Sequence, residues 1–162
     1  MTTTSLPIPY AIAAGAGERI WIVGDTLTIK ATGATTGGAL ALFEVDAAPG
    51  GGPPPHTHEH EDEVFYVLDG TFEILLGDER VTAGPGDVAF VPRGVVHRFA
   101  NIGETAARIL VLFTPAGMEG FFRAAGTPAT GDGPAPPLDG AEIGRTDAVA
   151  EQYGMRIGGW TR

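Results

Sequence analysis

Residues 55–63 read Pro-His-Thr-His-Glu-His-Glu-Asp-Glu, and residues 92–97 read Pro-Arg-Gly-Val-Val-His. These two stretches contain all four histidines of the 162-residue chain. Alternate side chains of a β-strand point to the same face, so His56 and His58 both point to one side of the chain. Two imidazoles on one face, with acidic residues close behind them, indicate a metal site built on strands.

The predicted site has four ligands, which are His56, His58, Glu63 and His97. Glu63 stands at the start of the next predicted strand, and His97 belongs to a strand far along the chain. Imidazole suits Ni, Co, Mn, Fe, Cu and Zn, and the carboxylate adds a hard, negatively charged ligand. A ligand set of this kind leaves a coordination position open for water or substrate, as catalytic sites do. We therefore expect one divalent transition metal per chain.

The other charged residues of the first stretch receive different assignments. His60 shares the alternation of the two histidine ligands, so we expect it either to support the ligands from outside the coordination sphere or to be an exposed loop histidine. Glu59, Glu61 and Asp62 are expected to form a solvated acidic turn.

Residues 19–113 alternate between short apolar runs and turn residues such as Asp69-Gly70 and Gly84-Pro85-Gly86. Many short strands at close spacing favour an all-β sandwich or barrel, and no helical periodicity interrupts the region. Strands are predicted at 20–23, 27–31, 39–45, 64–68, 71–76, 80–83, 87–91, 97–101 and 107–113.

Two short helices are predicted after this region, at 116–125 and 141–153. The Pro- and Gly-rich stretch 126–140 is expected to be a loop, and 155–162 a tail. A chain of 162 residues is most simply one domain.

Alternation in the strand after Glu63 places Phe65 and Val67 on one face, and it leaves Val64 and Tyr66 on the other. Both faces are apolar, although the outside of a lone barrel would be polar. Either the terminal segments or a second subunit must cover the outer face. We expect a homodimer.

Composition excludes several classes of partner. The formal charge of −10 makes nucleic acid and anionic membrane surfaces poor partners. No apolar run approaches the roughly 18 residues of a membrane span. The chain has no cysteine, and its N-terminus has no secretory signal pattern, so a cytoplasmic location is expected.

The spacing of the two histidine stretches resembles the cupin superfamily. The first cupin motif is filled by Gly50, His56, His58, Glu63 and Gly70, and the second by Gly86, Pro92, Gly94, His97 and Asn101. The resemblance implies a jelly-roll barrel, also called a double-stranded β-helix, in a single cupin domain over 1–162. Its barrel core would cover about 18–114, with a helical segment and tail at 115–162.

Within this superfamily, the chain is similar to bacterial quercetin 2,3-dioxygenase-like cupins at 51–56, 62–70, 113–117 and 147–154. That resemblance implies a dioxygenase that opens a flavonol or a similar aromatic substrate with O2. Glu63 would then be both a metal ligand and the base that takes the substrate hydroxyl proton.

The alternation of side chains along the strands predicts which residues line the substrate site. Phe65, Phe72 and Phe99 are the leading candidates for substrate contact, with Phe99 first because it shares a face with His97. The wider candidate set is Val67, Ile74, Phe90, Val95, Ile109 and Phe113.

Two other functions fit the same residues. A Zn-dependent cyclase or isomerase of a polyketide- or sugar-type substrate would use the same ligands without O2. A binding protein would keep the barrel without catalysing a reaction.

Overall fold

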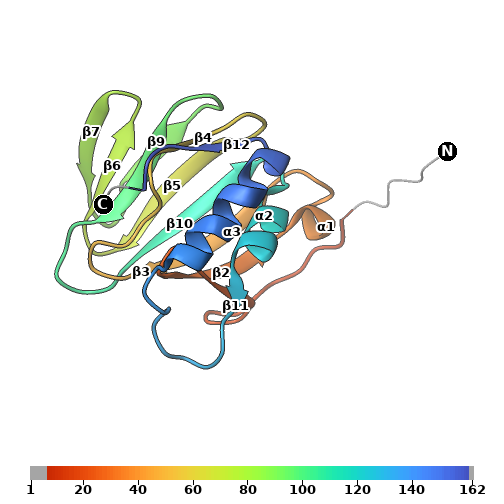
Figure 1. Cartoon of the computed structure of the whole chain (residues 1–162). Coiled ribbons are helices and arrows are strands. Elements are labelled where there is room, and N and C mark those ends of the chain that lie inside the picture. Colours follow the sequence, from red (N-terminus) through yellow and green to blue (C-terminus); the bar gives the residue numbers. More distant parts are fainter. Residues whose placement is uncertain (1–6, 161–162) are drawn as a thin grey trace.

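The computed structural model describes residues 7–160 and folds them into two antiparallel sheets (Figure 1). The larger sheet has the strand order β11 (Thr127–Pro128), β1 (Glu18–Ile22), β2 (Asp25–Ala31), β3 (Ala41–Ala47), β10 (Ala107–Thr114), β5 (Asp62–Asp69) and β8 (Val88–Val91). The smaller sheet has the order β12 (Met155–Ile157), β4 (His56–His58), β9 (His97–Asn101), β6 (Phe72–Leu76) and β7 (Glu79–Ala83). The prediction of an all-β core is confirmed.

The helices are short and lie mostly after the barrel. They are α1 (Gly33–Thr36), α2 (Met118–Ala125) and α3 (Gly140–Ala150), and a 3-10 helix, Glu151–Tyr153, follows α3. The two predicted helices are present, whereas α1 was not predicted. None of the helices among residues 7–160 is long and apolar enough to cross a membrane.

The tail prediction for 155–162 is wrong within the described residues, because Met155–Ile157 forms strand β12. This strand pairs with β4, and its register places Met155 opposite His58 and Ile157 opposite His56. The end of the chain is therefore built into the sheet that carries two of the predicted ligands. The short β11 likewise pairs with β1 inside the stretch that was expected to be a loop.

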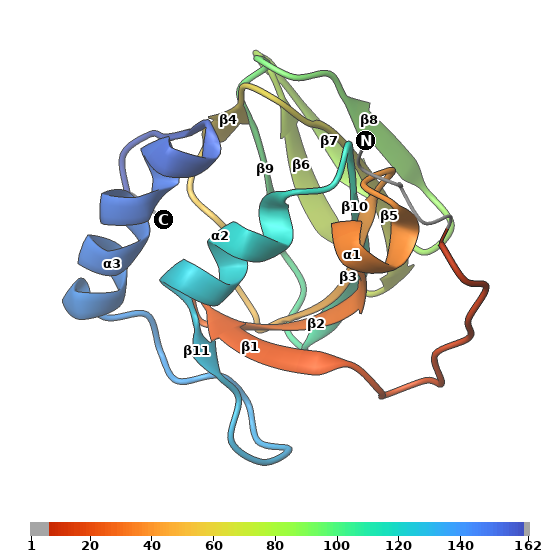
Figure 2. The ribbon, with the colours of Figure 1, turned by 90° about the vertical axis from the view of Figure 1, so that its right-hand side faces the viewer.

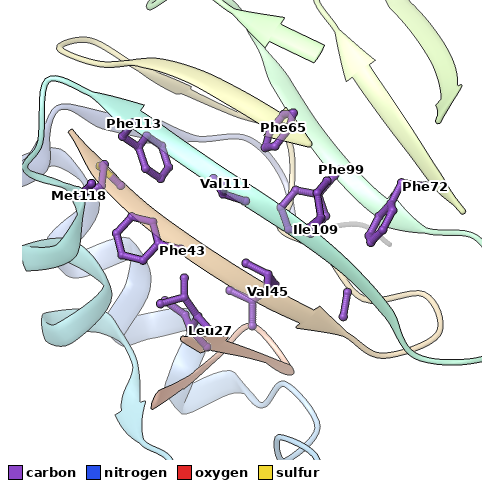
Figure 3. Close-up of a cluster of buried hydrophobic side chains, with 14 of the residues drawn as sticks. Leu27, Phe43, Val45, Phe65, Phe72, Phe99, Ile109, Val111, Phe113 and Met118 are labelled. Carbon is purple, nitrogen blue, oxygen red and sulfur yellow. The ribbon is translucent and has the colours of Figure 1, made fainter. Parts of the chain in front are cut away.

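Inward-facing side chains of the two sheets form the core, as the strict alternation of buried residues along β3 illustrates. Figure 3 shows Phe43, Phe65, Phe72 and Phe113 among the aromatic side chains of this cluster, and each is at most 1% exposed. Burial of a side chain of this size contributes about 1.5–3 kcal/mol. The core thus fixes the separation of the sheets that carry the candidate site.

Helices α2 and α3 lie side by side against the sheets (Figure 2). The α2 side chains Phe121 and Phe122 form a continuous aromatic cluster with Phe43 of β3, since ring centroids lie 4.9 Å apart for Phe43–Phe122 and 5.4 Å apart for Phe121–Phe122. The Asp139 side chain caps α3 by accepting a hydrogen bond from the Glu142 amide at 2.8 Å. Both helices are therefore anchored where they can cover the end of the barrel.

The outer face of the larger sheet exposes apolar side chains. Across β5 and β8, Val64 lies opposite Phe90 and Tyr66 opposite Val88. Val88 is 62% exposed, Phe90 58% and Tyr66 42%. The predicted pattern of two apolar faces is present, and nothing within residues 7–160 covers the outer one at these positions.

Candidate metal centre

Strands β4, β9 and β5 bring the four predicted ligands together. His56 lies directly opposite His97 in the β4–β9 pair, and His58 follows on the same buried face of β4. Glu63, near the start of β5, approaches from the opposite sheet. One ligand atom from each of the four residues lies within 4.8 Å of all the others. All four side chains are buried.

Short contacts join Glu63 to two of the imidazoles. The Nε2 atom of His97 lies 2.5 Å from Oε2 of Glu63, and the Nε2 atom of His58 lies 3.3 Å from the same oxygen. The rings of His56 and His97 are also close, with centroids 4.4 Å apart. The three imidazoles therefore converge on one carboxylate.

Backbone carbonyls orient two of the three histidines. Nδ1 of His56 lies 2.9 Å from the Pro54 oxygen, and Nδ1 of His97 lies 2.8 Å from the Val95 oxygen. A proton on Nδ1 that donates to a carbonyl leaves Nε2 as the acceptor atom, which is the atom a metal needs. The sequence before each histidine thus sets which nitrogen faces the centre.

Burial and neighbouring charges decide the proton states in the metal-free protein. Burial, with the charges of His97 and His58, lowers the pKa of His56 to about 3, so His56 is neutral at neutral pH. Burial alone would raise the pKa of Glu63, but the nearby imidazoles of His58 and His97 outweigh it and hold that pKa below its usual range. Burial also opposes a charge on His97, yet the hydrogen bond with Glu63 raises the His97 pKa. The contact with ionised Glu63 therefore favours the protonated form of His97.

The donor set fits a divalent transition metal. Both ring nitrogens of His58 are buried without a hydrogen-bond partner, which is costly unless another group satisfies them. Neutral imidazoles and an ionised carboxylate are the protonation states that metal ligands require. The cluster could thus hold one metal ion, and its ligand types do not select among Ni, Co, Mn, Fe, Cu and Zn.

An apolar cavity adjoins the cluster. Its volume is about 70 Å³ for the centres of water-sized spheres, which exceeds the roughly 10–15 Å³ that one water needs by this measure. His56, His58 and Glu63 border it, and Asp25 and Thr146 are the other polar residues in its wall. Such a cavity suits a compact organic group.

Of the three leading candidates for substrate contact, Phe99 lines this cavity. Phe65 and Phe72 do not line it, and each instead packs against Phe99, with ring centroids 5.6 and 5.8 Å away (Figure 3). Within the wider set, Phe113 also lines the cavity. Phe90 was wrongly expected to point inward; Ala89 and Val91 are the buried residues of β8.

Part of the wall comes from segments outside the strands that the alternation pattern predicted. It includes Met118, Phe121 and Phe122 of α2, and Met155, Ile157 and Trp160 near the chain end. The adjacent Phe121-Phe122 pair was the sequence signal for the α2 contribution. No comparable signal identified the residues near the chain end.

His60 lies in one of its two expected surroundings, whereas Glu61 does not lie where it was expected. His60 is exposed, with its ring against Gly154, where an added Cβ would meet the His60 Cδ2 atom at 2.5 Å. Glu61 is only 6% exposed, so its assignment to a solvated turn was wrong. Glu59 is exposed as expected, whereas Asp62 is the first residue of β5 and forms an ion pair with Arg93 at 3.0 Å.

Comparison with known proteins places this geometry in a family. Residues 43–113 match the family model of the cupin domain. Quercetin 2,3-dioxygenase of Bacillus subtilis (strain 168) is 30% identical over 132 residues, which cover 79% of this chain and 39% of that protein. The chain therefore spans less than half the length of that relative.

Solved structures agree on the fold. An RmlC-like cupin from Shewanella frigidimarina aligns with a TM-score of 0.58 at 20% identity, over 68% of this chain and 96% of that one. The polyketide cyclase RemF from Streptomyces resistomycificus aligns with a TM-score of 0.57 at 26% identity, over 66% of this chain and 80% of that one. With both motifs filled, two jelly-roll sheets and the matching family model, the chain belongs to the cupin superfamily.

Proposed function

We propose that this cupin is a metal-dependent enzyme that opens a flavonol or a similar aromatic substrate with O2, in the manner of a quercetin 2,3-dioxygenase. The observation that carries the proposal is the buried cluster of three histidines and Glu63 beside an apolar cavity. The similarity to the Bacillus subtilis dioxygenase supports the choice of reaction.

In this proposal, His56, His58, Glu63 and His97 hold the ion. When bound, a divalent metal would supply Lewis acidity to a substrate hydroxyl and lower its pKa. The ionised carboxylate of Glu63 lies at the border of the cavity, where its Oε2 atom can take the hydroxyl proton. The apolar wall keeps water away from the reacting group.

The character of the wall supports an uncharged aromatic substrate. Among the described residues that line the cavity, none is Lys or Arg. An anionic substrate would therefore find no basic partner in the wall, and burial of an unpaired charge is costly. Phe99 and Phe113 instead offer ring faces and edges for an aromatic group.

Oxygen uptake tests the reaction. Protein reconstituted separately with each divalent metal is given a panel of flavonols, and consumption of O2 is expected with at least one metal. Glu63→Gln is expected to abolish turnover while retaining part of the bound metal, because the amide cannot take the proton. Glu59→Gln, a matched change at an exposed position, should keep the wild-type rate. Unchanged O2 consumption in Glu63→Gln would contradict the proposed role.

A second candidate is a Zn-dependent cyclase, which the similarity to the polyketide cyclase RemF favours. The same ligands would then act on a substrate carbonyl without O2. Turnover of a polyketide-type substrate by the Zn form under anaerobic conditions would support this alternative. A protein that binds aromatic ligands without turning any of them over would instead be a binding protein.

We also propose that the chain forms a homodimer through the outer face of the larger sheet. The exposed side chains of Tyr66, Val88 and Phe90 support this proposal, because neighbouring exposed apolar residues mark interaction surfaces. The cavity wall is made of both strand and helix residues, which supports a single cupin domain for the chain.

The cytoplasmic location stays a prediction.

A further inference from the structure

The three histidines of the cluster are not held in the same way. His56 and His97 each place Nδ1 within 2.9 Å of a backbone oxygen. His58 has no such partner, and its Nδ1 atom is buried without a hydrogen bond. Its other nitrogen, Nε2, lies 3.3 Å from Glu63 Oε2. Contacts within the described residues therefore leave open which nitrogen of His58 carries the proton.

The side chain of Glu61 also has a buried atom without a hydrogen-bond partner, and this atom is an acceptor. Its side chain is 6% exposed, and its Oε2 atom is buried without a hydrogen-bond partner. Its Oε1 atom packs over Gly117 at the start of α2, where an added Cβ would lie 3.3 Å away. Burial raises the pKa of Glu61. A buried carboxylate oxygen and a buried ring nitrogen, each without a hydrogen-bond partner, thus belong to residues three positions apart in the chain.

We propose that Glu61 is a positioning residue for His58. Its carboxylate accepts the Nδ1 proton of His58, either directly after a small side-chain rotation or through one bridging water, and it thereby presents Nε2 to the metal. The inference rests on the proposed metal site.

The physical reason is competition between two carboxylates for one imidazole proton. Without Glu61, the His58 proton would be drawn to Nε2, where Glu63 can accept it. That tautomer blocks the atom which must bind the metal. With Glu61 on the other side, both buried orphan atoms are satisfied, and the metal-binding tautomer is favoured. Glu61 therefore does for His58 what backbone carbonyls do for the other two histidines.

The first test reads the tautomer of His58 in the metal-free protein. Nitrogen-15 NMR of labelled histidine, at a pH where the imidazoles are neutral, is expected to show the proton on Nδ1 in the wild type. Glu61→Ala should move it to Nε2, whereas Glu61→Gln should keep it on Nδ1, since the amide oxygen still accepts. Glu59→Gln, with the same chemical change at an exposed neighbour, should match the wild type. A wild-type proton on Nε2 overturns the proposal.

The second test measures Zn²⁺ affinity by competition with a chelator. Loss of such a supporting partner lowers metal affinity by roughly 10–100-fold, which is the weakening expected for Glu61→Ala. Glu61→Gln should lie between Glu61→Ala and the wild type, and it provides the comparison if Glu61→Ala does not fold. Affinities of all variants within twofold of the wild type would overturn the proposal. Failure of the wild type to bind any metal would instead overturn the metal site, while the tautomer measurement still decides the role of Glu61.

Discussion

At the scale of single residues, the centre is a set of buried groups whose charges depend on each other. Burial keeps His56 neutral, whereas the contact with ionised Glu63 favours the protonated form of His97. A metal would displace that proton and take its place between the imidazoles and the carboxylate.

The low pKa of His56 predicts a pH-dependent loss of stability in the metal-free protein. The unfolded chain protonates His56 near pH 6.5, whereas the folded chain does so only near pH 3. Below pH 6.5 the unfolded state therefore binds the extra proton, and stability falls as the pH falls. Between pH 7 and pH 5 this residue alone costs about 2 kcal/mol.

Urea unfolding at both pH values checks this effect. His97 acts in the opposite direction, because its raised pKa stabilises the fold at lower pH, so the wild type must be compared with His56→Gln. The loss from pH 7 to pH 5 should be larger in the wild type than in His56→Gln, by about 2 kcal/mol. Equal losses in the two proteins would show that His56 is not buried as a neutral imidazole.

Residue spacing was sufficient to nominate the four ligands, because it reflects strand alternation and the two cupin motifs. It was not sufficient for Glu61, whose burial depends on Gly117 at the distant start of α2. Strand alternation identified Phe65 and Phe72 as inward-facing residues without showing that they pack against Phe99 and do not line the cavity. Phe90 was misplaced because β8 turns the smaller Ala89 inward and leaves the larger ring outside.

At the scale of elements, one contact between α3 and the barrel lies at a strained turn. The backbone amide of Val23 donates to Glu142 Oε1 at 2.5 Å. Val23 has a φ of 56°, in the left-handed region that β-branched residues rarely adopt. Val23 and Thr146 of α3 both line the cavity, so this contact holds part of the wall in place.

Replacement of Glu142 by Ala is expected to loosen α3. The loss of an acceptor from a partly buried amide costs about 1–3 kcal/mol. Hydrogen exchange should become faster in α3 and at the β1–β2 turn, while the β3 and β10 amides stay protected. Glu151→Ala, at an exposed position directly after α3, is the matched control. Unchanged exchange in α3 of Glu142→Ala would show that other contacts hold the helix.

The strands of the barrel were predictable because their turns and alternation are local. Strand β12 was not, because its pairing with β4 brings together residues about 100 positions apart, such as Ile157 and His56. The cavity wall near the chain end, including Trp160, depends on that pairing and was missed for the same reason.

At the scale of the whole molecule, the proposed dimer predicts a response to charge on the outer face. Phe90→Glu should shift the protein from dimer to monomer, because a buried unpaired carboxylate opposes association. Light scattering after size-exclusion chromatography measures the mass directly. Val81→Glu, on the exposed strand β7 of the smaller sheet, should leave the mass unchanged. A monomeric wild type would contradict the dimer proposal.

The most direct test of the account is the metal content and affinity of the protein. Elemental analysis and calorimetric titration with a divalent transition metal are expected to give one ion per chain. His58→Ala should lose this binding, whereas His60→Ala, at the exposed histidine of the same stretch, should retain it. A wild-type protein that binds no metal, or equal affinities in the two histidine variants, would contradict the account.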